Sequence, residues 1–95
     1  KPITPEISSI KANKRKVSLR WKTVSNATGY YVYRSTNPKT SFKKVKTVTG
    51  GQTSYTEKKA LSKNKTYYYK IVAFDKSGSK ITKSNASKAK KIFVK

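Results

Sequence analysis

The sequence contains no cysteine and no histidine, and its only acidic residues are Glu6, Glu57 and Asp75. The absence of cysteine excludes disulfides, thiolate nucleophiles and cysteine-based metal sites, so packing alone must hold the fold. General acid–base catalysis needs positioned histidines or carboxylates, and hard cations need clustered oxygen ligands. We expect the three acids to be solvated residues that offset nearby lysines. We therefore predict that this segment is not an enzyme and has no catalytic residue, cofactor or metal ion.

Long apolar runs are also absent. No stretch of about 18 apolar residues is present, which predicts that no transmembrane helix lies within these residues. A chain of 95 residues is expected to bury roughly 65% of the surface that its unfolded form exposes, which is enough for one compact core. Because the chain starts at Lys1 rather than at a methionine, we interpret residues 1–95 as a single domain cut from a longer protein.

Negative charge is scarce beside 24 lysines and arginines, which gives a formal net charge of +21 at pH 7. Only three of these cations are arginine. Lysine is a strongly hydrated point charge, whereas the planar fork of arginine suits bidentate recognition of bases. This balance favours diffuse attraction to anionic surfaces. We therefore do not expect nucleic acid to be the physiological ligand. High charge with low hydrophobicity is also typical of disorder, but the regular alternation of the aromatic residues predicts a folded chain.

Apolar residues recur with a period of two, which predicts β-strands. Strands are expected at 6–12, 15–23, from Gly29 onward, 42–48, 53–56, 66–75 and, with interruptions, 80–95. Turn signals such as Gly50-Gly51 and Lys76-Ser77-Gly78-Ser79 separate them. Seven strands with turns at intervals of about 8 to 12 residues are the signature of an all-β sandwich.

Several correlated positions resemble those of fibronectin type III domains, and the resemblance covers almost the whole chain. They are Trp21 in the second strand, Tyr30 and Val32 in the third, and Leu61 six residues before Tyr67. The stretches around Tyr30 and Tyr67 look especially like modules of secreted and cell-wall-associated proteins of Gram-positive bacteria. The resemblance implies a seven-stranded immunoglobulin-like β-sandwich of two antiparallel sheets. It also implies a tyrosine corner, in which the Tyr67 hydroxyl satisfies an otherwise unpaired backbone group.

The alternation, and for Leu61 the family resemblance, assigns ten residues to the core between the two sheets. One inward row is expected from the second strand and another from the long strand 66–75. The predicted core residues are Val17, Leu19, Trp21, Tyr30, Val32, Leu61, Tyr67, Tyr69, Ile71 and Ala73.

The opposite side of the second sheet is predicted to expose aromatic side chains among cations. This candidate ligand face consists of Tyr31, Tyr33, Arg34, Tyr68, Lys70 and Phe74, with Val72 beside them. Aromatic rings next to cations can hold sugars by stacking, or nucleic acid by stacking and charge. Two plainer interpretations stay open: cross-strand tyrosine pairs that only stabilise a half-solvated sheet, and contact with a neighbouring domain.

Two functions follow as hypotheses. The first is a non-catalytic accessory or spacer module of a secreted or cell-surface bacterial protein, whose lysine-rich surface associates with anionic cell-wall polymers or other polyanions. A charge of this size exceeds what solubility requires, although lysines also keep edge strands unpaired. The second is a carbohydrate-binding accessory module of a glycoside-active enzyme that uses the exposed tyrosine face. In both, the domain is an extracellular or wall-associated monomer whose partners are the neighbouring domains of its parent protein and anionic polymers or glycans.

Overall fold

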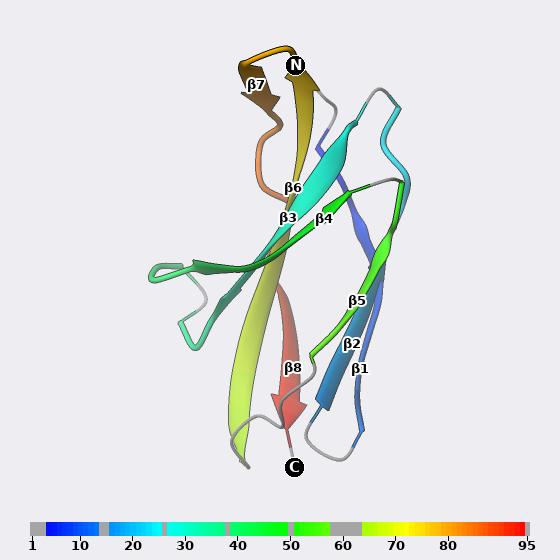
Figure 1. Ribbon diagram of the computed structural model, residues 1–95. Helices are drawn as coiled ribbons and strands as arrows, with labels where there is room; N and C mark the ends of the chain where they lie inside the picture. Colours follow the sequence, from blue (N-terminus) through cyan, green and yellow to red (C-terminus); the bar gives the residue numbers. More distant parts are fainter. Residues whose placement is uncertain are drawn as a thin grey trace.

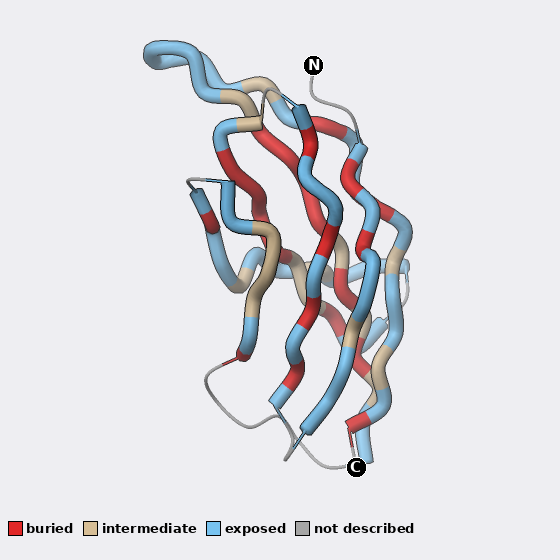
Figure 2. The backbone as a smooth tube through the Cα atoms, turned by 90° about the vertical axis from the view of Figure 1, so that its right-hand side faces the viewer, coloured by how far each residue is buried: buried red, intermediate tan, exposed pale blue. Residues whose placement is uncertain are grey.

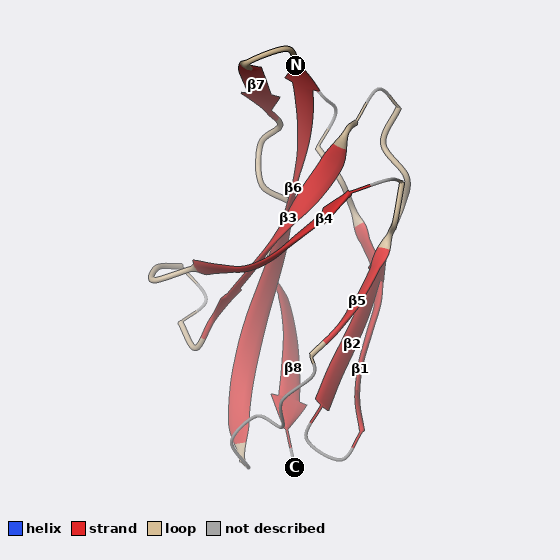
Figure 3. Ribbon diagram, viewed as in Figure 1, coloured by secondary structure: helices blue, strands red, loops and turns tan. Residues whose placement is uncertain are grey.

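The computed structural model describes residues 4–13, 16–25, 27–37, 39–49, 51–57 and 64–94. Within these ranges the chain forms only β-strands, connected by loops and turns (Figure 3). The strands are β1 (Ile7–Asn13), β2 (Lys16–Trp21), β3 (Gly29–Ser35), β4 (Lys43–Thr49), β5 (Ser54–Thr56), β6 (Lys65–Ser77), β7 (Lys80–Lys83) and β8 (Lys90–Val94). The described ranges contain no helix of the length and apolarity that crossing a bilayer requires.

Two antiparallel sheets pack against each other (Figure 1). Sheet A has the strand order β1-β2-β5, and sheet B has the order β4-β3-β6-β7, with β8 also paired to β6. Seen as in Figure 1, sheet A lies on the right of sheet B. The predicted all-β sandwich of two antiparallel sheets is confirmed. The structure has eight strands in its described part rather than seven, because the last predicted strand is divided into β7 and β8.

Two buried serines explain this division. The Ser84 N–H donates to the Ala73 carbonyl at 2.8 Å, and the Ala73 N–H donates to the Ser84 hydroxyl at 2.9 Å. Ser87 forms the same pair of hydrogen bonds with Ile71, both at 2.9 Å. The segment between β7 and β8 therefore still follows β6, but serine side chains supply acceptors that regular pairing would take from the backbone.

The core lies between the two sheets, and buried and exposed residues alternate along the strands around it (Figure 2). Nine of the predicted core residues are 7% exposed or less, and the core also includes Ile7, Val24, Val48 and Val94. Leu61 lies outside the described residues. The rings of Trp21 and Tyr30 meet edge-on with centroids 5.4 Å apart. The Tyr30 hydroxyl accepts a hydrogen bond from the Val24 N–H at 2.8 Å, which ties the loop after β2 to the core.

The sandwich is elongated, with extents of 42 × 24 × 21 Å. In Figures 1 and 2, which differ by a quarter turn, β1 begins toward one end of the long axis and β8 ends at the other. The strands thus carry the chain from one pole of the domain to the opposite one.

Gly29 begins β3 beneath the ring of Phe74. A Cβ atom at this position would lie 2.3 Å from the Val48 carbonyl oxygen and 2.9 Å from two ring carbons of Phe74. Both distances are far shorter than van der Waals contact, and the first is to backbone. Close approach of β3 to β4 and to Phe74 therefore requires glycine here.

We expect Gly29→Ala to lower the free energy of unfolding by about 3 kcal/mol, because no rotamer change can relieve a clash with a backbone oxygen. Gly51→Ala is the matched control. Its Cβ would meet open space, and its positive φ alone should cost about 1 kcal/mol. Urea unfolding of both variants measures the difference, and equal losses would contradict a packing role for Gly29.

Candidate functional site

The outer face is the side of sheet B that points away from sheet A, and the predicted ligand residues on it come from β3 and β6. The register pairs Tyr31 with Val72 and Tyr33 with Lys70. Since the residues before and after each of these point into the core, these side chains project outward. Tyr33, Tyr68 and Lys70 are half-buried.

The centre of the outer face is buried, so the expectation that its aromatic side chains are exposed is wrong there. Tyr31, Val72 and Phe74 are 7%, 8% and 5% exposed and form a second apolar cluster, with Tyr33 packed against it. The rings of Tyr31 and Phe74 stack with centroids 4.5 Å apart and an angle of 17° between their planes. Tyr33 meets Tyr31 edge-on at 6.5 Å. Neither stacked ring offers an open face to a sugar.

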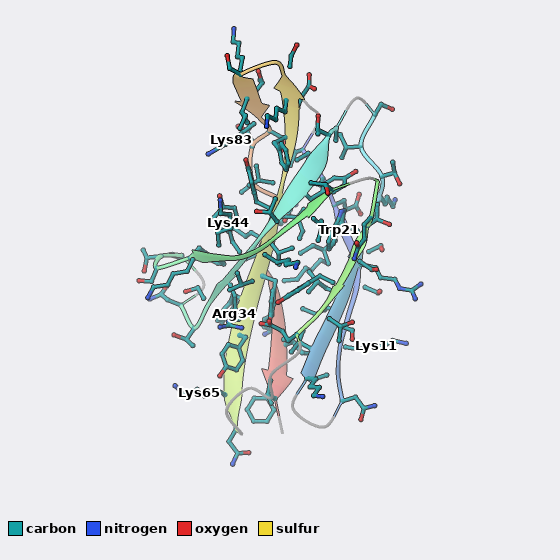
Figure 4. All side chains as sticks on the ribbon, viewed as in Figure 1. Lys11, Trp21, Arg34, Lys44, Lys65 and Lys83 are labelled. Atoms are coloured by element: carbon teal, nitrogen blue, oxygen red, sulfur yellow. The ribbon has the colours of Figure 1, made fainter. Side chains whose placement is uncertain are left out.

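Lysines from the edge strands cover this cluster. The Nζ atoms of Lys44 in β4 and Lys83 in β7 lie 4.5 and 5.5 Å from the centroid of the Tyr31 ring. The Nζ atom of Lys70 lies 4.5 Å from the centroid of the Phe42 ring. The face of an aromatic ring attracts a cation, and the alkyl part of a lysine side chain covers apolar surface. Figure 4 shows Lys44 and Lys83 on the side of sheet B that faces away from β1 and β2.

Arg34 does not belong to the outer face, and its predicted place there is wrong. In β3 it alternates with Tyr33 and so shares the inward side of Tyr30 and Val32. Its guanidinium forms an ion pair with Glu57 and lies 5.9 Å from the centroid of the Tyr67 ring. Arg34 therefore acts between the sheets. Tyr67 is buried, and the hydroxyl contact expected from a tyrosine corner stays a prediction.

Glu57, which follows β5, is the centre of a buried polar network and not the solvated residue that we expected. It is 6% exposed. One carboxylate oxygen accepts hydrogen bonds from Arg34 and, at 2.9 Å, from the Tyr69 hydroxyl. The other accepts the Tyr55 hydroxyl at 2.6 Å. The prediction failed because neighbouring lysines suggested a solvated acid, whereas the actual partners come from three other places in the sequence.

Burial and the negative charge of Glu57 keep both tyrosine hydroxyls of this network protonated. Burial, the hydrogen bond to Glu57 and its charge raise the pKa of Tyr55 to about 12. Burial and the charge of Glu57 also raise the pKa of Tyr69. Burial alone would lower the pKa of Arg34, but its attraction to Glu57 and their hydrogen bond raise it. The network thus joins one anion, one cation and two neutral donors, which suits it to link the sheets.

The other two carboxylates lie at the surface of the sandwich. Glu6 pairs with Lys22 at 3.8 Å, with both side chains largely exposed. Asp75 in β6 accepts a hydrogen bond from the Thr28 hydroxyl at 3.4 Å. Across the described ranges, histidine, cysteine and acidic residues form no group of three that could hold a metal ion.

Comparison with known proteins identifies the fold. No protein-family model matches the sequence, and no curated protein matches it. An Fn3-like protein from Clostridium thermocellum superposes with a TM-score of 0.70 at 24% identity, over 90% of this chain and 88% of that protein. The FN3tt mutant superposes with a TM-score of 0.68 at 22% identity, over 97% and 91%. The chain has the fibronectin type III fold.

Part of a larger enzyme has a similar fold. A β-1,2-glucanase from Parabacteroides distasonis superposes with a TM-score of 0.82 at 24% identity, over 99% of this chain. The chain spans only 13% of the length of that glucanase. The match is therefore to one part of a larger protein.

We expect Glu57→Gln to lower the free energy of unfolding of this domain by about 2 to 4 kcal/mol, because it leaves the partly buried Arg34 cation without its counter-ion. Glu6→Gln is the matched control, since it removes the same charge from an exposed ion pair and should cost less than about 1 kcal/mol. Urea unfolding of both variants gives the comparison. Similar small losses would show that the buried network adds little to stability.

Stability should decline at alkaline pH, because Tyr55 has a pKa of about 12 in the folded domain and about 10 in an unfolded chain. Above pH 10 the unfolded chain loses this proton first, so the contribution of Tyr55 is complete below that pH and is lost as pH rises to about 12. Tyr55→Phe should therefore make the decline shallower. Tyr68→Phe, which removes a tyrosine hydroxyl outside the network, is the matched control. Urea unfolding between about pH 9 and 12 measures the three slopes, and identical slopes would contradict the assignment.

Proposed function

We propose that this chain is a non-catalytic accessory or spacer module of a secreted or cell-surface bacterial protein, and that its lysine-rich surface associates with anionic polymers. The observation that carries the proposal is the imbalance of charge pairing. The sequence has 24 cationic residues and three carboxylates. In the described part of the chain, ion pairs engage Glu6 with Lys22 and Glu57 with Arg34. Most of the positive charge is therefore available to an external partner.

The cations are spread over the domain rather than gathered at one point. Figure 4 labels Lys11 on the side of sheet A, Lys44 and Lys83 on the side of sheet B, and Lys65 toward the end where β8 ends. All four residues are exposed. Such a surface attracts polyanions from many directions, and the attraction weakens as salt screens it.

The shape of the domain supports a role as a spacer. The described chain begins toward one end of the 42 Å long axis and ends at the other, so domains joined before and after it would lie in line. The occurrence of a similar unit within a β-1,2-glucanase supports membership in a longer protein. Carbohydrate binding by an exposed tyrosine face has less support, because Tyr31 and Phe74 are buried and Arg34 points inward.

A salt titration of binding tests this proposal. The chain is added to an immobilised poly(glycerol phosphate), to heparin and to a neutral β-glucan. We expect binding to both anionic polymers that falls steeply between about 50 and 200 mM salt, and no binding to the neutral polymer. Failure to bind either polyanion at the lowest salt concentration would overturn the proposal, whereas salt-resistant binding to the glucan would favour carbohydrate recognition.

A further inference from the structure

Lys44 and Lys83 come from opposite edges of sheet B but converge over one aromatic ring. The strand order β4-β3-β6-β7 places their strands three spacings, or about 14 Å, apart. Their Nζ atoms lie 4.5 and 5.5 Å from the centroid of the Tyr31 ring, so no more than about 10 Å separates the two nitrogens. The two side chains therefore reach toward each other across the outer face.

These two ammonium groups repel each other, and the described structure pairs neither of them with a carboxylate. Their position over the Tyr31 ring offsets part of this repulsion, because the face of an aromatic ring carries negative electrostatic potential. Both lysines are exposed to solvent. An anion bound between them would offset the remaining repulsion between the two ammonium groups, and the sheet would not have to rearrange.

The ring beneath the lysines is held firmly. Tyr31 is 7% exposed and stacks on Phe74 at 4.5 Å, and Phe74 in turn packs on Gly29. Lys70, which lies over the Phe42 ring, provides a further cation on the same face. A linear polymer seated between Lys44 and Lys83 could place its next charge there.

We infer that Lys44, Lys83 and the Tyr31 ring form a binding position for a phosphate group of an anionic polymer. This inference rests on the proposed function and assigns it a specific place. Lysine binds phosphate as a point charge and needs no planar geometry. Two converging ammonium groups match two successive, singly charged phosphates of one chain, or a terminal phosphate that carries up to two negative charges. One isolated carboxylate or sulfate ester carries a single charge and matches the pair less well.

Calorimetric titration with inorganic polyphosphate at low salt tests this position. Lys44→Gln/Lys83→Gln removes the position, and Lys11→Gln/Lys16→Gln removes the same number of charges from exposed residues of sheet A. We expect the first double variant to lose at least tenfold in affinity and the second about twofold. Equal losses would overturn the inference and leave the proposed diffuse attraction intact. If wild type binds neither polyphosphate nor heparin, the proposed function itself fails.

Two further measurements separate the phosphate position from its alternatives. In NMR titrations with inorganic phosphate, the side-chain signals of Lys44 and Lys83 should shift well before those of Lys11 and Lys16, and uniform shifts of all four would contradict the inference. Heparin provides the sulfated comparison. A larger effect of Lys44→Gln/Lys83→Gln on heparin than on polyphosphate would overturn the preference for phosphate. Unchanged urea midpoints of both double variants establish that folding is not the cause.

Discussion

The arrangement of the two sheets depends on the hydrogen bonds and the ion pair that the buried carboxylate of Glu57 forms. Its oxygens accept hydrogen bonds from Arg34 in β3, Tyr55 in β5 and Tyr69 in β6. Its backbone N–H donates to the Val17 carbonyl in β2 at 2.8 Å. Strands of both sheets thus meet at one residue. A buried carboxylate is costly unless donors surround it, so the network fixes how the sheets sit in a chain that has no cysteine to join them.

Periodicity predicted the sandwich well, because one inward row of apolar residues on each sheet is a local property of the sequence. The buried network was not predictable in the same way. The partners of Glu57 lie 2, 12 and 23 positions away, and no local pattern links them. Arg34 was assigned to the outer face, although its position in β3, two residues after Val32, places it on the inner side. The alternation of side chains along β3 was the better guide, because Glu57, the counter-ion of Arg34, lies between the sheets.

The outer face shows the same limit in another form. Alternation placed Tyr31 and Phe74 correctly on that side of the sheet, but alternation within one strand does not show that Lys44 and Lys83, from the adjacent strands β4 and β7, lie over the Tyr31 ring. Exposure of a sheet face is decided by the length and direction of its neighbours' side chains. Here the residues that provide the positive charge are also the ones that shield the aromatic cluster from water.

The course of the chain between the two poles of the domain determines how the fold would respond to tension. Because β1 begins toward one pole and β8 ends at the other, a pull on the two ends acts along the strands. The hydrogen bonds that β8 and the Ser84–Ser87 segment make with β6 would then be loaded in shear, all at the same time, rather than broken one after another. A domain linked at both ends would resist such a load far better than one whose strands could be peeled apart.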